Sequence, residues 1–206
     1  MMRFLYGSIL VLLLGCATAN QSRQEVQAEV DCIKRFKPSF KSDLYNASVD
    51  VVGKHLSGLV LFKIMPDSSI RVVFTNEAGV KFFDFGFQRD GNFTAYHVMK
   101  KLNRKPVVKT LRSDFELVIM KYIEEQIPHV YLQGDNLEFA FAKDNEVKNV
   151  IADRNCHTLI RLEKGTKEKI NTLAHLYNKG KQTPDSILIE HLNFNMKIKL
   201  KRLERL

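Results

Sequence analysis

Three cysteines have the most distinct covalent chemistry in this chain, because a thiolate can be acylated, oxidised or bound to a metal. Cys32 and Cys156 form an even pair, and such a pair in an oxidising compartment predicts a disulfide. The bond would close a loop of roughly 125 residues and stabilise the fold by several kcal/mol in the chain-entropy model. Two buried thiols would explain the pair equally well. There is no CxxC motif or Cys/His cluster, so the sequence does not favour a metal site.

The histidines and acidic residues form no arrangement that is typical of an enzyme. The histidines build no HxxxH or HExxH pair, and we interpret each as a surface or sheet residue. They are His55, His97, His129, His157, His175 and His191. Glu124 and Glu125 are adjacent and would point in different directions, which makes them a poor acid/base pair. No nucleophile elbow, phosphate-binding loop or dinucleotide fingerprint occurs, so we expect neither an enzyme nor a cofactor.

The first fifteen residues have the pattern of a signal peptide. Arg3 is followed by an apolar run over residues 4–14. The run has about eleven residues, which is too short for a transmembrane helix of ~20 residues. The sequence therefore predicts export of the chain.

The apolar run ends in Leu-Leu-Gly-Cys at residues 13–16, which resembles the bacterial lipobox. The resemblance implies that a diacylglycerol is attached to the thiol of Cys16 and that the leader is cut before this residue. It also implies that the new amino group is acylated, for example with palmitate, and several acyl chains give stable anchoring. By the enterobacterial rule, a residue other than Asp at position 17 implies an outer-membrane lipoprotein facing the periplasm. An ordinary secretory leader, cut after the Ala-x-Ala site at residues 17–19, is the alternative.

The composition predicts one globular domain behind this leader. Hydrophobic residues make up 45% of the chain and charged residues 27%. We assign residues 1–15 to the signal peptide, 16–36 to the lipid anchor and a polar tether, and 37–206 to a single domain. The 32 Lys and Arg exceed the 23 Asp and Glu, for a formal net charge of +9. Anionic membrane headgroups or simple solvation explain this excess, whereas export argues against nucleic acid as a partner.

Period-two alternation of apolar residues is the dominant pattern after the tether, and it predicts half-buried strands. Candidate strands cover residues 48–55, 59–65, 70–75, 83–87 and 93–99, and then 137–141, 147–151, 158–162, 169–176, 187–192 and 196–200. The clearest alternation is that of Val60, Phe62 and Ile64, of Ile70, Val72 and Phe74, and of Phe83, Phe85 and Phe87. Short polar turns between these segments predict antiparallel hairpins.

One segment has helical periodicity instead. Apolar residues at helical spacing over residues 108–122 form a single stripe, Pro106 fits a first helical turn and Pro128 marks the end. The predicted fold class is therefore α+β. We expect a strongly curved antiparallel sheet of about ten strands, a half-open barrel, with this amphipathic helix covering its concave face.

This combination of a lipobox, a tether, a curved sheet and an inserted helix resembles the LolA/LolB-like lipoprotein carrier and receptor family. The stretches 53–59 (GKHLSGL), 71–77 (RVVFTNE) and 191–195 (HLNFN) also resemble uncharacterised lipoproteins of the Bacteroidetes group. The family resemblance implies a half-open barrel that holds acyl chains in an apolar cavity beneath a helical lid. It also implies binding without covalent chemistry.

By this interpretation, an acyl chain of a lipid or lipoprotein occupies a cavity lined by phenylalanines. The candidates are Phe62, Phe74, Phe83, Phe85, Phe115 and Phe139. Burial contributes ~0.8 kcal/mol per methylene, so even half an acyl chain gives useful affinity. These aromatic rings could instead fill a packed core. In that case the chain would be a structural or assembly lipoprotein that docks on an envelope protein complex.

Overall fold

The computed structural model describes residues 23–178 and 181–204, and one antiparallel sheet holds most of them. The strands of the N-terminal half are β1 (Gln24–Glu25), β2 (Ser42–Val51), β3 (Lys54–Ile64), β4 (Ile70–Thr75), β5 (Lys81–Phe87) and β6 (Phe93–Val98). Those of the C-terminal half are β7 (His129–Gln133), β8 (Asn136–Lys143), β9 (Glu146–Asp153), β10 (Leu159–Thr166), β11 (Ile170–Tyr177), β12 (Ser186–His191) and β13 (Met196–Arg202). The helices are the 3₁₀ helix η1 (Val30–Phe36), α1 (Lys105–Ile119) and the short α2 (Tyr122–Glu125).

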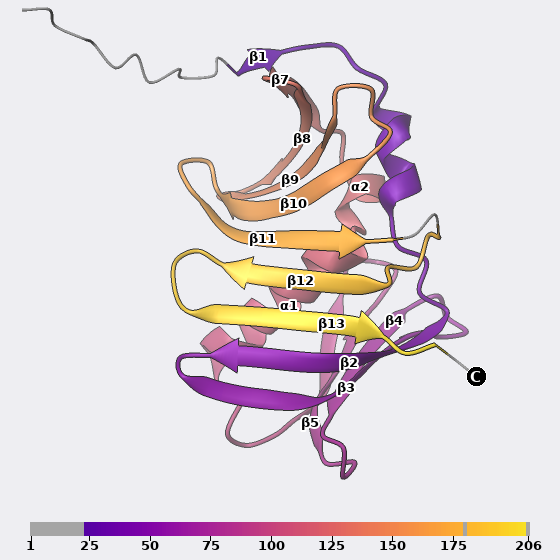
Figure 1. The fold of residues 1–206 in the computed structure, drawn as a ribbon, viewed down its shortest axis with the longest axis vertical. Coiled ribbons are helices and arrows are strands. Elements are labelled where there is room, and N and C mark those ends of the chain that lie inside the picture. Colours follow the sequence, from indigo (N-terminus) through magenta and orange to yellow (C-terminus); the bar gives the residue numbers. More distant parts are fainter. Residues whose placement is uncertain (1–22, 179–180, 205–206) are drawn as a thin grey trace, which may run out of the picture.

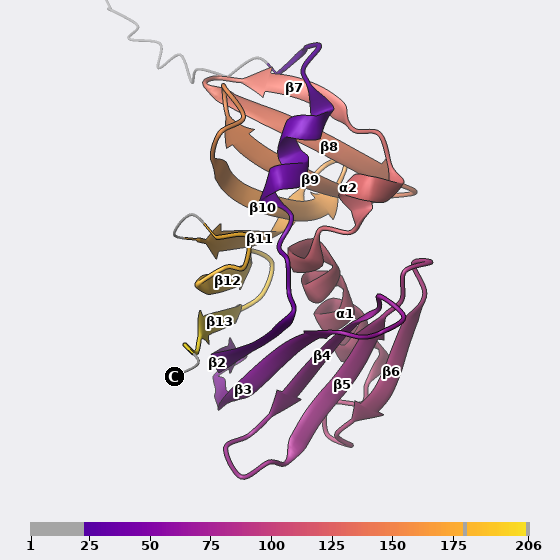
Figure 2. The same ribbon diagram turned by 90° about the vertical axis from the view of Figure 1, so that its right-hand side faces the viewer.

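The sheet consists of two meanders that share one seam. Strands β2–β6 follow one another, as do β7–β13, and β13 pairs with β2 to join the two runs. Figure 1 shows this continuous succession, and Figure 2 shows the sheet curling around α1. In the described part of the chain, β1 and β6 are the two edges of the sheet, so the sheet does not close.

The predicted antiparallel, half-open sheet is confirmed, but the count of about ten strands is wrong, because the sheet has 13 strands within the described residues. The two-residue strand β1 is too short for a periodic pattern. Residues 48–55 are not one strand, since they hold the end of β2, a tight turn and the start of β3. Val52 and Gly53 in this turn have φ angles of 46° and 74°, which suit a two-residue hairpin turn. A β-branched residue such as Val52 is rare at positive φ, so the sequence pattern does not indicate a turn at this position.

The prediction of one helix covering the concave face is also inexact. The stripe over residues 108–122 is divided, because Met120 ends α1 in the left-handed conformation with φ 55° and Tyr122 begins α2. Helix α1 lies inside the curl, while α2 and η1 lie next to each other beside β8–β10 (Figure 2). The concave side is therefore covered by three short elements rather than by one helix.

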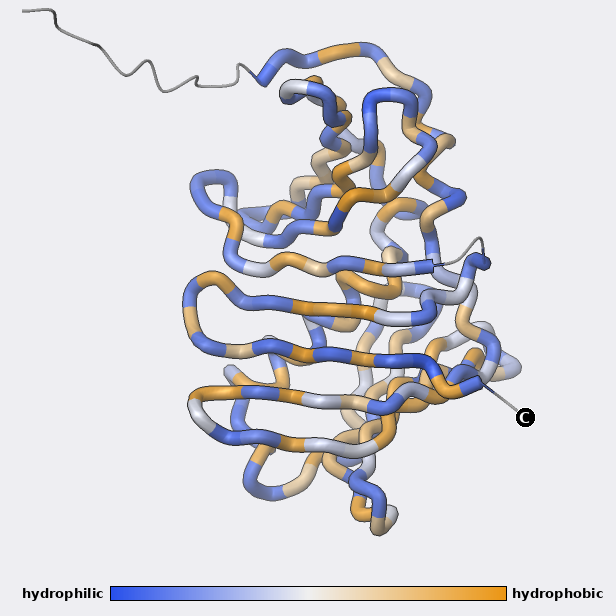
Figure 3. The backbone as a smooth tube through the Cα atoms, in the orientation of Figure 1, coloured by the Kyte–Doolittle hydropathy of each residue, from blue (hydrophilic) through white to orange (hydrophobic). Residues whose placement is uncertain are grey.

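The core follows the alternation along the strands. Figure 3 shows hydrophobic and hydrophilic residues alternating along β13. On β13, Met196, Ile198 and Leu200 are buried, while the lysines between them face outward and range from half-buried to exposed. The inward-facing rows of the two meanders meet α1 through Leu111 and Phe115, which are both buried. The helix is thus held by apolar contacts to strands from both ends of the chain.

A disulfide ties the N-terminal segment to the second meander. Cys32 on η1 bonds to Cys156 in the β9–β10 turn, with the two Cα atoms 6.1 Å apart and the residues separated by 124 positions. Cys156 has φ 53°, and Asp153 holds its turn: Oδ1 of Asp153 accepts hydrogen bonds of 2.6 Å from the N–H groups of His157 and Thr158.

Residues 23–36, which fell within the predicted tether, pack against the sheet. Strand β1 pairs with β7, and Ile33 on η1 is fully buried. Arg23 forms a double hydrogen bond with the carboxylate of Glu138, at 3.0 and 3.1 Å. The signal peptide and Cys16 lie outside the described residues.

Candidate functional site

An apolar cavity of about 600 Å³ lies between α1 and the inner face of five neighbouring strands. Its strand side is formed by residues that are paired across β13, β2, β3, β4 and β5. These are Val49, Val60, Phe74, Phe83, Met196 and Ile198. The register places Val49 opposite Ile198, Val60 opposite Phe74, and Phe74 opposite Phe83. Each strand therefore adds at least one apolar side chain to a continuous wall.

One face of α1 forms the other side of the cavity. Its contribution comes from Val107, Thr110, Leu111 and Phe115. Pro106 stands at the start of α1, where the missing N–H costs no hydrogen bond and the fixed φ suits a first helical turn. The helix therefore begins close to the mouth of the cavity.

Exposed side chains form the rim of the cavity. Val52 lies in the β2–β3 turn and is 71% exposed, and Phe194 lies in the β12–β13 turn and is 38% exposed. A backbone hydrogen bond from the N–H of Val52 to the carbonyl of Asn195 holds these turns together. Lys54 and Arg104 also line this region, so cations lie beside an otherwise apolar opening. Such a rim suits a ligand with an apolar chain and a polar or anionic end.

The structure divides the six phenylalanines that the sequence singled out. Phe74, Phe83 and Phe115 line the cavity. Phe62 and Phe85 are fully buried behind it, where the ring of Phe62 packs 5.8 Å from that of Phe115 and the ring of Phe85 stacks 4.4 Å from that of Phe83. Phe115 thus separates an open apolar space from a packed aromatic core.

Phe139 lies apart from that aromatic group. It is on β8 in the second meander, is fully buried and does not line the cavity. The alternation along β8 shows which side chains face inward, but it carries no information on which part of the interior is filled.

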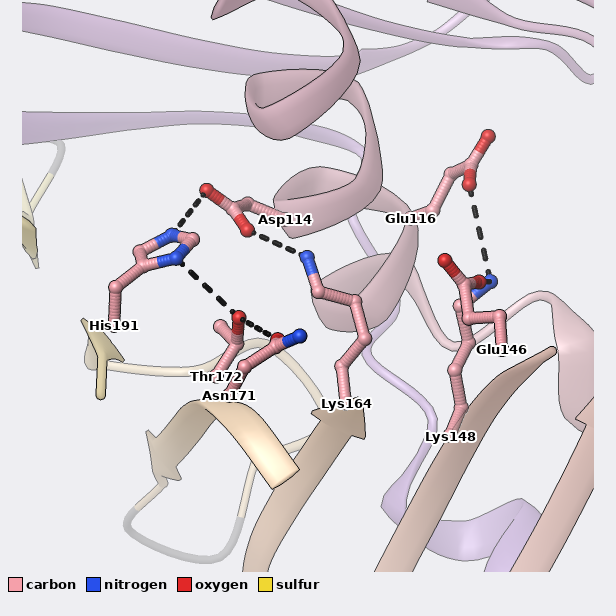
Figure 4. A network of polar contacts seen from close by, with 8 residues as sticks. All are labelled: Asp114, Glu116, Glu146, Lys148, Lys164, Asn171, Thr172 and His191. Carbon is pink, nitrogen blue, oxygen red and sulfur yellow. Dashed lines mark hydrogen bonds and ion pairs between the residues drawn. The ribbon is translucent and has the colours of Figure 1, made fainter. Parts of the chain in front are cut away.

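A buried polar network holds α1 against the second meander, and Figure 4 shows its side chains converging from four elements. Asp114 of α1 is fully buried, and its Oδ1 lies 2.8 Å from Nζ of Lys164 on β10. Its Oδ2 lies 2.9 Å from Nε2 of His191 on β12. The His191 Nδ1 lies 3.4 Å from the hydroxyl of Thr172 on β11. Because these groups are paired with one another, they position the helix rather than offer a reactive centre.

Sequence reasoning missed this network, although its signal is present. Asp114 stands among Leu111, Phe115 and Val118 on the apolar stripe of the helix, and Lys164 shares a strand face with Leu162. A charged residue on an apolar face is a candidate for a buried ion pair. The sequence pattern predicts a surface or sheet histidine at position 191, whereas the side chain of His191 is only 4% exposed.

Within residues 23–178 and 181–204, no group of three or more His, Cys, Asp or Glu side chains is arranged to hold a metal ion. None of the helices in these residues has the length and apolar character needed to cross a membrane. The apolar cavity is therefore the site whose chemistry is best defined.

The fold is similar to solved structures, although the sequence matches no protein-family model and no curated protein. One is a DUF1329 family protein from Desulfovibrio piger, 13% identical, with a TM-score of 0.51 over 88% of this chain and 92% of that chain. A LolA superfamily protein from Nitrosomonas europaea is 8% identical, with a TM-score of 0.52 over 85% and 90%. A domain described as an outer membrane lipoprotein-sorting protein, from Vibrio parahaemolyticus, is 8% identical, with a TM-score of 0.51 over 85% and 90%. At these identities the likeness shows a LolA-like fold and nothing beyond the fold, and the resemblance to Bacteroidetes lipoproteins stays a prediction.

Proposed function

We propose that this protein is a lipoprotein of the cell envelope whose domain holds an acyl chain of a lipid or lipoprotein in the apolar cavity. The observation that carries the proposal is the cavity itself, about 600 Å³ between α1 and strands β13, β2, β3, β4 and β5. Its volume falls within the range of small-molecule sites, roughly 300–1,000 Å³. An interior lined by valine, leucine, isoleucine, methionine and phenylalanine favours a hydrocarbon over a polar ligand.

The energetics of burial support this function. Each methylene transferred from water contributes ~0.8 kcal/mol, so about ten methylenes gain roughly 8 kcal/mol before the costs of association. Binding needs no covalent step, since the aligned side chains of Val60, Phe74 and Phe83 provide apolar contact along the chain. At the rim, Lys54 and Arg104 would lie near the polar end of such a ligand.

The envelope location rests on the leader and on the fold. Attachment of diacylglycerol to Cys16 would place the domain next to a membrane, and an outer-membrane lipoprotein facing the periplasm is the form that we propose. Structural neighbours described as LolA superfamily or lipoprotein-sorting proteins share the fold, which supports a carrier-type role here. An oxidising compartment is also consistent with the disulfide between Cys32 and Cys156.

A cavity-filling substitution tests the proposal without removing core contacts. Val107→Trp places an indole in the cavity from α1, so saturable binding of a fluorescent fatty acid should be lost while the unfolding transition is retained. Ile127→Trp is the matched control, because Ile127 is 91% exposed and does not line the cavity. This control should bind like the wild type.

The same titration distinguishes an acyl-chain carrier from a structural lipoprotein. If folded, monomeric wild-type protein shows no saturable binding of any acyl ligand, the carrier function fails. A structural lipoprotein that docks on an envelope protein complex then takes its place.

A further inference from the structure

A second concavity, which we call the polar cleft, lies on the opposite face of α1 from the apolar cavity. It has a volume of about 560 Å³ and is bordered by the β5–β6 turn, α1, α2 and the β8–β9 turn. Arg112, Ser113 and Glu116 of α1 line it, whereas Leu111 and Phe115 line the apolar cavity. With about 100° between successive helical residues, these two sets point in different directions. The two concavities share no lining residue.

Three residues that line the polar cleft carry buried polar atoms that have no hydrogen-bond partner within the described protein. These atoms are Oε1 of Gln88, Oγ of Ser113 and the hydroxyl of Tyr122. Tyr122 is 5% exposed, and burial raises the pKa of its hydroxyl well above the usual value, so this group stays a hydrogen-bond donor. Buried side-chain atoms without partners are uncommon in native proteins. Three of them around one cleft indicate a partner from outside the chain.

The charged side chains around the polar cleft indicate whether that partner is an anion or a cation. Lys148 Nζ lies 2.9 Å from Glu146 and 3.8 Å from Glu116, and it lies 5.4 Å from the centroid of the Tyr122 ring (Figure 4 shows the two glutamates and Lys148). Arg112 pairs with Glu116 at 2.7 Å, so this carboxylate is shared by two cations.

Two further lysines add unpaired positive charge. Lys109 and Lys143 line the cleft, and neither forms an ion pair with any residue that the structure describes. The lining holds five basic and four acidic side chains, so one bound anionic group would balance its net charge.

We propose that the polar cleft binds a phosphate ester that carries a free hydroxyl, as a phosphoglycerol group does. The hydroxyls of Tyr122 and Ser113 would donate to the phosphate oxygens, and Lys109, Lys143 and Lys148 would supply the positive charge. Gln88 Oε1 accepts but cannot donate, so it suits the hydroxyl of the ligand rather than its phosphate. This site is independent of the acyl-binding function, because it rests on other residues.

Titration of the purified full chain with two probes tests the site. Glycerol 1-phosphate represents a free phosphate ester, and dihexanoyl phosphatidylglycerol below its micelle concentration represents a lipid headgroup. At least one probe should bind saturably, and Tyr122→Phe and Ser113→Ala should each weaken that binding about tenfold. Binding of both probes indicates that the phosphoglycerol group suffices. Binding of the lipid alone identifies a headgroup as the source, and binding of glycerol 1-phosphate alone identifies a free ester.

The stability of the variants provides the second measurement. Tyr122→Phe and Ser113→Ala remove hydroxyls that have no partner in the free protein, so neither should lower the midpoint of denaturant unfolding. Tyr131→Phe and Ser57→Ala are matched controls outside the cleft and should bind as the wild type does. Absence of saturable binding of both probes, or binding that Tyr122→Phe leaves unchanged, overturns the proposal. Acyl binding in the apolar cavity is measured separately with the fluorescent fatty acid, so failure of one site is distinguishable from failure of the other.

Discussion

Asp114 on α1 and Lys164 on β10 form an ion pair of 2.8 Å in the interior, where the carboxylate is fully buried and the lysine side chain is 8% exposed. The pair joins the helix beside the apolar cavity to strand β10, which does not line this cavity. His191 contacts the second carboxylate oxygen, so three elements meet at one carboxylate. The position of α1, and with it the shape of the cavity, therefore depends on a polar contact as well as on apolar packing.

Removing one partner of this pair should be far more harmful than removing both. Asp114→Asn leaves the Lys164 ammonium buried without its counter-charge, and we expect the free energy of unfolding to fall by about 3–5 kcal/mol. The double variant Asp114→Leu/Lys164→Met replaces the pair with apolar groups and should recover a large part of that loss. Urea unfolding of the three proteins measures both effects. Equal losses in the single and double variants would contradict the role given to the pair.

The disulfide should stabilise the fold mainly through the long loop that it closes. Replacing Cys32 and Cys156 together by alanine should lower the free energy of unfolding by about 2–5 kcal/mol, because 124 positions separate the two residues. A reductant should produce a similar loss in the wild type and no further loss in the double variant. Two free thiols per chain in native, oxidised protein would show that the bond does not form.

The turn that contains Cys156 should depend on pH through Asp153. Hydrogen bonds from the backbone N–H groups of Thr158 and His157 hold the pKa of Asp153 below its usual value. A lowered folded-state pKa means that the stabilisation is present above the unfolded-state pKa of about 3.9. It is lost as the pH falls through the lower folded-state value. Amide hydrogen exchange of Thr158 should therefore show constant protection near neutral pH and lose it in strong acid. In Asp153→Asn, protection should be weaker at neutral pH and insensitive to this acid range, and identical profiles would refute the assignment.

Local alternation predicts which side chains face inward, but it does not predict the shape of the space that they enclose. Phe83 and Phe85 follow the same pattern on β5, and both are buried. Phe83 lines the cavity and Phe85 lies in the packed core, because the ring of Phe115 lies between the open and the filled space. That difference depends on where α1 crosses the curved sheet, which is a property of the tertiary structure.

The local sequence pattern does not predict which distant strands pair with each other either. The alternation of Met196, Ile198 and Leu200 predicts a strand, and β13 is that strand. Its partner β2 lies more than a hundred residues earlier in the chain, so the contribution of Met196 and Ile198 to the cavity wall follows from a non-local contact. The buried Asp114–Lys164 pair is the opposite case, because a charged residue on the apolar stripe of a helix indicates a buried ion pair.

The exposed rim of the cavity should affect ligand binding without affecting the fold. Phe194 is 38% exposed in the β12–β13 turn and lines the mouth of the cavity, so Phe194→Ser removes apolar contact with the ligand at little cost in packing. We expect fatty-acid affinity to fall about tenfold, equivalent to roughly 1.4 kcal/mol, with an unchanged unfolding midpoint. Tyr177→Ser is the matched control, because Tyr177 is 54% exposed and lies outside the cavity lining. Equal loss of affinity in both variants would argue against a ligand that enters past Phe194.

Lipid attachment should depend on Cys16, which lies outside the described residues, and not on the other two cysteines. Cys32 and Cys156 are joined in a disulfide, so neither sulfur is free to carry a diacylglycerol. Metabolic labelling with an alkyne analogue of palmitate should mark the wild type and leave Cys16→Ser unlabelled, with the variant found as an uncleaved precursor or released from the membrane. Cys32→Ser is the matched control, since it also loses one thiol and should keep the label. The seven residue-to-residue steps from Cys16 to Arg23 span at most about 25 Å when fully extended, so a lipid on Cys16 would keep β1 and β7 close to the membrane surface. Undiminished labelling of Cys16→Ser would contradict both the anchor and this placement.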